Sequence, residues 1–366
     1  MSEWKEYKLG DIATFHYGKS LKTEHRISGN IPVFSSAGLS GWHNQSLIDS
    51  QSIIVGRKGT IGKVYFCDKP FWCIDTAYYI LPNDEKYNFK FLYYLLLTLG
   101  LDELNEDSAV PGLNRDTAYS QTILLPSLPK QKSIAHILSS LDDKIDLLHR
   151  QNATLEKMAE ALFRQWFVEG AKDEWKEKSL YDCIELVGGG TPKTEKTEYW
   201  NGTINWLSGG DISSNHKNFV IKAEKTITDL GLNNSSAKLL PQYSTVISAR
   251  GTVGKYCLLA EPMAFSQSNY GILPKYKNCF FFTYLLLAHC VDELLSAAYG
   301  SVFDTITTNT FKGINVCLPK EKQIIDFEEK IKPYIKKMVN NQTQIRTLTH
   351  LRDTLLPKLM SGEIKM

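Results

Sequence analysis

Two glycine-containing turns carry the side chains of this sequence that are best suited to bind a ligand. They read Lys58-Gly59-Thr60-Ile61-Gly62-Lys63 and Arg250-Gly251-Thr252-Val253-Gly254-Lys255. Glycines let a backbone approach a ligand closely, while amides, a threonine hydroxyl and cations can contact phosphate oxygens or a guanine edge. The pattern favours DNA contact, and an ordinary solvated hairpin is the alternative. The turn residues expected to contact DNA are Arg57, Lys58, Gly59, Thr60, Lys63, Arg250, Gly251, Thr252 and Lys255.

The first turn does not match the nucleotide-binding P-loop, Gly-x4-Gly-Lys-Ser/Thr. Five residues rather than four separate Gly56 from Gly62, and Val64 stands where the hydroxyl ligand of magnesium is needed. In the second turn Ala249 stands where the motif requires its first glycine. We therefore do not expect either turn to bind a nucleoside triphosphate.

Two further segments, residues 35–45 and 208–215, are dense in small hydrogen-bonding side chains. Readout of base edges requires donors and acceptors of this kind. The candidates for DNA contact are Ser35, Ser36, Asn44, Ser208 and Asp211. Ordinary polar loops explain the same composition equally well.

The other polar residues indicate no catalytic or metal site. Acid-x-Lys triplets occur at residues 84–86, 142–144 and 328–330, and we interpret them as solvated faces because two of them lie on expected long helices. The seven cysteines are scattered singly, without a Cys-x-x-Cys pair or a histidine at ligand spacing, so we expect them to be reduced and mostly buried. Neither a methyltransferase Asn/Asp-Pro-Pro-Tyr motif nor a nucleophile elbow is present. We expect a non-catalytic chain that binds no metal or cofactor of its own.

The composition indicates a globular protein of about two domains. The chain has 366 residues, of which 43% are hydrophobic and 22% are charged. A net charge of +2 is too small for DNA binding by bulk charge, so basic contacts must be local or come from a partner. The longest apolar runs, residues 91–97 and 280–288, are too short to cross a bilayer, and the N-terminus lacks a signal pattern. We expect a cytoplasmic protein.

The sequence contains one unit written twice. Trp4-Lys5-Glu6 recurs as Trp175-Lys176-Glu177 at an offset of 171, the glycine turns recur at an offset of 192, and Tyr94-Leu95-Leu96-Leu97 recurs as Tyr284-Leu285-Leu286-Leu287 at 190. A period of this size corresponds to a whole domain rather than a solenoid repeat. The growth of the offset means that the second copy carries extra residues before its glycine turn, so we expect the copies to differ most there.

Each copy is expected to form a compact α/β domain. Strands are predicted at residues 52–55, 64–67 and 77–81, and again at 245–248, 256–259 and 270–273, because these segments are mostly β-branched or aromatic and lie between glycine-bearing turns. Buried helices are predicted at residues 87–101 and 280–295.

A long helix is expected after each copy. From residue 130 to 167, apolar residues recur at alternating steps of four and three, without glycine or proline, which predicts one helix about 57 Å long. The pattern returns at an offset of 190, where Pro333 is expected to kink or interrupt the second helix.

The two helices are expected to pair in antiparallel orientation, because each supplies the apolar partner that the other lacks. Asn152 and Gln342 occupy equivalent positions, where a buried amide would fix the register, and a water-facing polar gap is the alternative. The residues expected to pair the helices are Leu138, Leu141, Ile145, Leu148, Asn152, Leu155, Ile331, Ile335, Met338, Gln342 and Ile345.

In its order of motifs the chain resembles the specificity (S) subunits of Type I restriction-modification enzymes. The resemblance covers essentially the whole chain. It rests on Trp4-Lys5-Glu6 with Leu9-Gly10-Asp11, on both Gly-Thr-x-Gly-Lys turns, on Leu-Pro before each long helix, and on residues 161–167 and 355–362.

The resemblance implies an α+β fold, in which two duplicated α/β target-recognition domains are separated by two long antiparallel helices that form a coiled coil. The expected bounds are 1–129 and 171–319 for the two domains, 130–170 for the central conserved spacer helix and 320–366 for the C-terminal one. Each domain would read one half of a bipartite, interrupted DNA site. The helices would set the gap and dock two DNA methyltransferase (M) subunits.

The resemblance also implies a division of labour. Restriction and translocase (R) subunits would complete an ATP-dependent complex that cleaves DNA and methylates adenine. S-adenosylmethionine, ATP and Mg²⁺ would be bound by those partners. Two other readings stay open: a two-domain coiled-coil scaffold that binds proteins without DNA, and a chain that is itself an enzyme.

Overall fold

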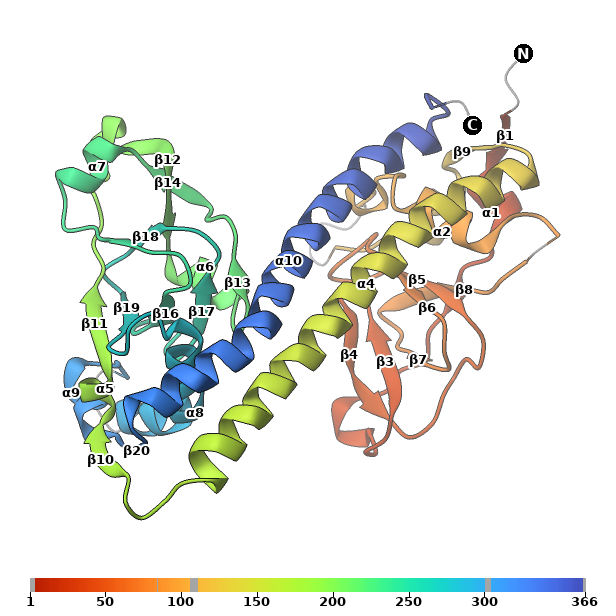
Figure 1. Ribbon diagram of the computed structural model, residues 1–366. Helices are drawn as coiled ribbons and strands as arrows, with labels where there is room; N and C mark the ends of the chain where they lie inside the picture. The colour runs from red at the N-terminus through yellow and green to blue at the C-terminus, as the bar shows by residue number, and fades with distance from the viewer. Residues whose placement is uncertain (1–3, 84, 106–110, 300–303, 365–366) are drawn as a thin grey trace. The chain divides into compact units, whose positions relative to one another are not determined.

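The computed structural model describes residues 4–83, 85–105, 111–299 and 304–364, and the chain divides into two compact units. Unit 1 comprises Met1–Ile145 and Thr347–Met366, and unit 2 comprises Asp146–Arg346. Each unit contains one sequence copy together with part of each long helix (Figure 1).

The described part of unit 1 contains three small sheets and short helices. Its strands are β1 (Lys5–Lys8), β2 (His16–Tyr17), β3 (Ile31–Ser35), β4 (Gly38–His43), β5 (Ser52–Gly56), β6 (Val64–Cys67), β7 (Trp72–Cys73), β8 (Ala77–Ile80) and β9 (Thr122–Leu125). They form the sheets β1-β9, β2-β8-β5-β6 and β4-β3-β7. The helices α1 (Leu9–Ile12), α2 (Phe89–Leu96) and α3 (Arg115–Tyr119) precede the long helix α4 (Leu128–Arg164).

Unit 2 repeats this plan with additions. Its strands are β10 (Lys176–Ser179), β11 (Ile184–Gly188), β12 (Trp200–Leu207), β13 (Phe219–Val220), β14 (Lys225–Ile227), β15 (Leu239–Leu240), β16 (Thr245–Ser248), β17 (Tyr256–Leu259), β18 (Met263–Phe265), β19 (Asn269–Pro274) and β20 (Asn315–Leu318). They form the sheets β10-β20, β11-β19-β16-β17-β13 and β14-β12-β18-β15. Its helices are α5 (Leu180–Cys183), α6 (Gly209–Ser214), α7 (Asp229–Asn233), α8 (Phe280–Tyr299), α9 (Thr308–Gly313) and α10 (Glu321–Met360).

The two topologies confirm the duplication. The order β2-β8-β5-β6 in unit 1 matches β11-β19-β16-β17 in unit 2, and both second sheets contain one parallel pair, β3 with β7 and β12 with β18. The predicted strands coincide with β5, β6, β8, β16, β17 and β19 within two residues at either end. The predicted helices overlap α2 and α8, although α2 ends at Leu96 rather than near residue 101.

The extra residues of the second copy lie before its glycine turn, as the growth of the offset from 171 to 192 predicts. Strands β3 and β4 are joined by a two-residue turn, whereas α6 and β13 lie between the equivalent strands β12 and β14. Helix α7 and strand β15 follow before β16. The copies therefore share one sheet framework and differ in the segments attached to it.

The first long helix forms as expected. Helix α4 begins two residues before the predicted start, and a π-helical turn, Gln165–Glu169, continues it past its last residue. Helix α10 runs from Glu321 to Met360, so the expected interruption at Pro333 is wrong, and a kink there stays a prediction. Although proline removes one backbone hydrogen bond, Ile331 and Ile335 on either side of it are buried and hold the helix in the core of unit 2.

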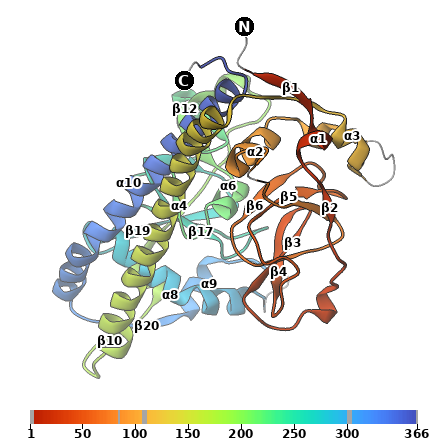
Figure 2. The ribbon, with the colours of Figure 1, turned by 90° about the vertical axis from the view of Figure 1, so that its right-hand side faces the viewer.

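In unit 1 the first part of α4 packs against the end of α10. Ile134 and Leu138 share a buried cluster with Leu359 and Met360, and α2 lies between α4 and strands β5 and β6 (Figure 2). Asp142 on α4 accepts hydrogen bonds of 2.8 Å from Arg352 Nη1 and 2.5 Å from the Tyr94 hydroxyl. Asp142 is therefore an interface residue and not part of a fully solvated face.

In unit 2 the later part of α4 packs against the start of α10. Phe163 and Phe167 contact Phe327 with ring centroids 6.0 and 4.8 Å apart. Asn152 pairs with Asn341, which is fully buried, rather than with Gln342 one position later. The contacts 152 with 341 and 163 with 327 run in opposite chain directions, so the helix pair is antiparallel within this unit (Figure 1).

Among the described residues, α8 is the one helix long and apolar enough to span a membrane. It extends well beyond the apolar run seen in the sequence, because polar residues such as Asp292 and Glu293 continue it. Eleven of its residues are buried, and most of these lie in the main cluster of unit 2. Its position is that of a core helix.

Candidate nucleic-acid interface

In unit 1 the glycine turn closes the hairpin between β5 and β6. The amides of Gly56 and Gly62 donate 2.8 Å hydrogen bonds to the carbonyl oxygens of Lys63 and Gly56. Gly59 and Gly62 adopt φ angles of +77° and +67°, which favour glycine. A Cβ on Gly62 would lie 2.1 Å from the backbone nitrogen of Asp102, so this glycine also permits a close backbone approach.

The turn of unit 2 has the same geometry. The amides of Ser248 and Gly254 donate to the carbonyl oxygens of Lys255 and Ser248, at 2.7 and 2.9 Å. Gly251 and Gly254 adopt φ angles of +77° and +79°. Two segments from different copies of the duplicated unit thus present the same backbone turn.

Most of the predicted cations on these turns are free to meet a ligand. Lys58, Arg250 and Lys255 are exposed, and none of them makes a side-chain hydrogen bond or ion pair with another described residue. Lys63 differs, because its Nζ lies 3.0 Å from Asp102 Oδ2 in an ion pair that solvent reaches on both sides. Thr60 and Thr252 are also exposed.

Each turn lies against one of the polar loops. In unit 1 the Cα of Gly59 faces Ser36, whose Oγ would be 4.0 Å from an added Cβ. In unit 2 the Thr252 hydroxyl donates a 3.4 Å hydrogen bond to the Gly209 carbonyl oxygen. The structure therefore brings the predicted segments of each copy together on one surface.

The Ser35 and Ser208 loops have structural roles of their own. The Ser35 hydroxyl accepts from the Ala37 amide at 3.2 Å within the β3–β4 turn. Ser208 and Asp211 form a capping box at the start of α6, and the second carboxylate oxygen of Asp211 accepts from the Glu224 amide at 2.9 Å. Both oxygens of Asp211 are therefore engaged within the protein.

Asn44 lies apart from the turn. It follows β4, whose opposite end meets Ser35, so the six residues of β4 place it about 20 Å from the β3–β4 turn. Its side chain is exposed.

Tyr17 and Arg115, which the sequence patterns did not indicate, lie beside the first turn. The guanidinium carbons of Arg57 and Arg115 lie 4.9 and 5.3 Å from the ring centroid of Tyr17. Together with Lys58 they line a cavity of about 210 Å³. Tyr17 and Arg115 are far from the turn in sequence, and only a position-by-position comparison of the two copies would have marked them.

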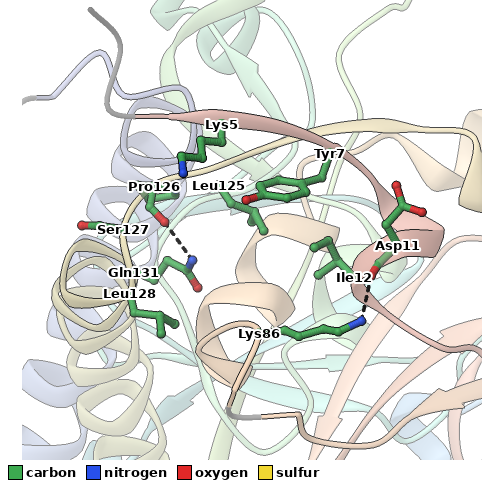
Figure 3. A pocket seen from close by; sticks show the side chains of 10 residues that line it. All are labelled: Lys5, Tyr7, Asp11, Ile12, Lys86, Leu125, Pro126, Ser127, Leu128 and Gln131. Atoms are coloured by element: carbon green, nitrogen blue, oxygen red, sulfur yellow. Dashed lines mark hydrogen bonds between the residues drawn. The ribbon is translucent and has the colours of Figure 1, made fainter.

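A larger cavity of about 500 Å³ in unit 1 contains none of the predicted site residues. It lies between β1, α1 and the start of α4 (Figure 3). Its polar groups are largely satisfied by the protein: Lys86 Nζ donates to the Asp11 carbonyl oxygen at 3.0 Å, and Gln131 Nε2 donates to the Pro126 carbonyl oxygen at 2.9 Å.

The described part of the chain contains no cluster of three or more histidine, cysteine or acidic side chains placed to hold a metal ion. The seven cysteines are free thiols, and all except Cys317 are buried. Burial raises the pKa of the Cys73 thiol to about 12. The triplet residue Asp84 lies outside the described residues, and Glu328 is buried rather than solvated.

The family model described as "Type I restriction modification DNA specificity domain" matches residues 1–157 and 172–350. Over their full lengths, the chain is 24% identical to the Type I restriction enzyme HindI specificity subunit of Haemophilus influenzae. It is 25% identical to the MjaIX specificity subunit of Methanocaldococcus jannaschii, covering all of this chain and 94% of that one.

A solved structure shares the fold. It is the S subunit of a Type-I restriction-modification system from M. genitalium, which aligns with a TM-score of 0.68 at 17% identity over 98% of this chain and 96% of that one.

Proposed function

The chain belongs to the family of Type I restriction modification DNA specificity domains, and from this premise we propose that it is the sequence-specific DNA-recognition subunit of a Type I restriction-modification complex. Each unit reads one half of a bipartite, interrupted site. The observation that carries this proposal is the repeated surface: both units present an exposed cation and a threonine on the same glycine turn, next to a polar loop.

The turns suit contact with a DNA backbone. An exposed lysine or arginine without an internal partner can neutralise a phosphate. Lys58 and Arg250 occupy equivalent positions in the two units, so each half-site would receive a cation at the same place.

The helices α4 and α10 contribute residues to both units, and we propose that they set the number of base pairs between the half-sites. They also offer the surface on which two methyltransferase subunits dock, and restriction subunits complete the complex. S-adenosylmethionine, ATP and Mg²⁺ would be bound by those partners, and adenine would be flipped into the methyltransferase. In this arrangement the present chain carries no catalytic residue and acts in the cytoplasm, where the DNA is.

A salt titration of DNA binding by the chain with its methyltransferase tests this function against a scaffold that does not touch DNA. The logarithm of the binding constant should fall linearly with the logarithm of the salt concentration. In the double variant Lys58→Ala/Arg250→Ala the slope should become shallower by about two, because two phosphate contacts are lost. A slope identical to that of the wild type would assign DNA contact to the methyltransferase alone.

A further inference from the structure

The cavity beside the first glycine turn is lined by an unusual set of side chains. Arg57, Lys58 and Arg115 line it together with Tyr17, which is 49% exposed. None of these three cations forms an ion pair with another described residue, and the buried Nε of Arg115 has no hydrogen-bond partner among them. The cavity thus concentrates positive charge and unused donors.

Both arginine side chains lie against aromatic rings. The guanidinium of Arg57 lies against Tyr17, and its Nη1 donates a 3.1 Å hydrogen bond to the Asp75 carbonyl oxygen. The guanidinium of Arg115 lies against Tyr17 and 5.8 Å from the ring of Tyr119. A guanidinium held against a ring presents its donors in a defined plane.

The second copy provides an internal comparison, because its backbone is equivalent at these positions. The amides of Arg57 and Ala249 donate to the carbonyl oxygens of Thr76 and Ser268, at 2.9 and 3.0 Å. Tyr17 pairs with Tyr78 in the sheet, as Gly188 pairs with Tyr270.

The start of the following short helix matches as well. The amides of Leu113 and Ile306 donate to the carbonyl oxygens of Arg57 and Ala249, at 2.8 and 3.1 Å. Asn114 and Thr307 then cap α3 and α9, so the first helical residues, Arg115 and Thr308, are equivalent.

The backbone contacts that hold the fold are therefore retained, but the side-chain cluster is not. Unit 2 has Gly188, Ala249 and Thr308 in place of Tyr17, Arg57 and Arg115. Steric crowding does not account for the glycine, because a Cβ on Gly188 would meet nothing within 4 Å. By contrast, the cations and the threonine of the turn are present in both units: Lys58, Thr60 and Lys63 correspond to Arg250, Thr252 and Lys255.

This division matches the two kinds of DNA contact. Every half-site has phosphates, so contacts to them can be the same in both units, whereas residues that read bases must differ when the half-sites differ. Oriented guanidinium groups match the O6 and N7 acceptors of guanine. The cavity, of about 210 Å³, is smaller than the roughly 300 Å³ lower bound for sites of drug-sized ligands, so a base edge fits the site better than such a ligand does.

We propose that Arg57 and Arg115, held against Tyr17, read guanine in the half-site bound by unit 1. The proposal rests on the function given above and adds the residues that determine one part of the specificity.

The test measures adenine methylation by the chain assembled with its methyltransferase, on duplexes that each carry one base change in the recognised site. For the wild type, one half-site should contain a required guanine. In Arg57→Gln and Arg115→Gln, discrimination at a guanine of that half-site should fall by roughly 5- to 150-fold, with a shift towards adenine, the base that glutamine matches. The other half-site should be unaffected.

Arg250→Gln is the matched control, since it changes a cation of the other unit at the position equivalent to Lys58. It should lower methylation of all duplexes without altering base preference. If Arg57→Gln fails to assemble with the methyltransferase, Arg57→Lys carries the test, because it keeps the charge but loses the two-donor edge.

Three outcomes would overturn the proposal: a uniform loss across all duplexes, which indicates a phosphate contact; unchanged discrimination; or a wild-type site without guanine in either half. If the wild-type complex has no bipartite site at all, the proposed function itself fails, and that result is distinct from the other three.

Discussion

The side-chain amide of Asn341 on α10 donates a 2.9 Å hydrogen bond from Nδ2 to Oδ1 of Asn152 on α4. Asn341 is fully buried, and Asn152 is 9% exposed and also donates to the Met338 carbonyl oxygen at 3.4 Å. The structure therefore has a buried amide pair at this position rather than a water-facing polar gap. We expect the pair to fix the register, because sliding one helix by a turn would leave both amides unpaired.

Asn341→Ala should destabilise unit 2 by about 1–3 kcal/mol, because Asn152 would keep a buried acceptor without this donor. The double variant Asn152→Ala/Asn341→Ala should lose less than the sum of the two single changes. Chemical denaturation of the four proteins gives the coupling free energy. Strictly additive effects would show that the pair does not act as a unit.

Glu328 on α10 caps the start of α8. Its carboxylate oxygens accept hydrogen bonds of 3.2 and 2.7 Å from the amides of Phe281 and Phe282. Burial raises the pKa of this carboxyl to about 7, although the two amides act in the opposite direction. The folded state therefore binds a proton more tightly than the unfolded state does.

The stability of unit 2 should accordingly depend on pH between about 4.5 and 7. The contribution of Glu328 is fully present below pH 4.5 and is lost as the pH rises through 7, on the order of 3 kcal/mol in total. In Glu328→Gln this part of the dependence should vanish. Chemical denaturation from pH 5 to 8 gives the free energy of unfolding of both proteins. If the two free energies change with pH in parallel, Glu328 is not the buried group that titrates.

The glycines of the first turn should differ in their tolerance of substitution. Gly62→Ala should destabilise unit 1 strongly, since the new Cβ would lie 2.1 Å from the Asp102 backbone nitrogen. Gly59→Ala should cost only about 1–2 kcal/mol, because its φ of +77° is unfavourable for alanine but the space around it is open. Thermal unfolding would compare the two, and equal losses would argue against the close approach.

Much of this fold follows from periodic patterns in the sequence. The heptad spacing predicted α4, and the repeated glycine turns and β-branched segments predicted the equivalent hairpins of both units. These predictions succeed because local patterns of burial repeat along one helix or one strand.

Other features depend on contacts between distant segments. Glu328 in its triplet looks like any solvated helix residue, and its burial follows only from the position of α8 against α10. Likewise Tyr17 meets Arg115 only after β2 pairs with β8 and α3 folds back beside them. The sequence indicated the glycine turns of the site but not their neighbours.

Lys58→Ala and Arg250→Ala should each weaken DNA binding by the assembled complex and leave assembly intact. Both cations are exposed and unpaired among the described residues, so the loss should be nearly independent of DNA sequence, and each salt slope should fall by about one. Lys277→Ala, an exposed lysine beyond the far end of β19, is the control and should bind normally. If all three variants and the wild type bind DNA equally well, the glycine turns have only a structural role.

Exchanging residues 171–319 for those of a relative should change one half of the recognised site only. These residues include every strand of unit 2 and none of unit 1. Methylation of duplexes that combine old and new half-sites measures the change. New preferences in both halves would show that the units do not read DNA independently.

Mapping methylated adenines across the genome, in cells with and without this chain, tests the central claim most directly. We predict that methylation at one bipartite, interrupted sequence is present only in cells that contain the chain. An identical methylation pattern in both would contradict its role as the DNA-recognition subunit.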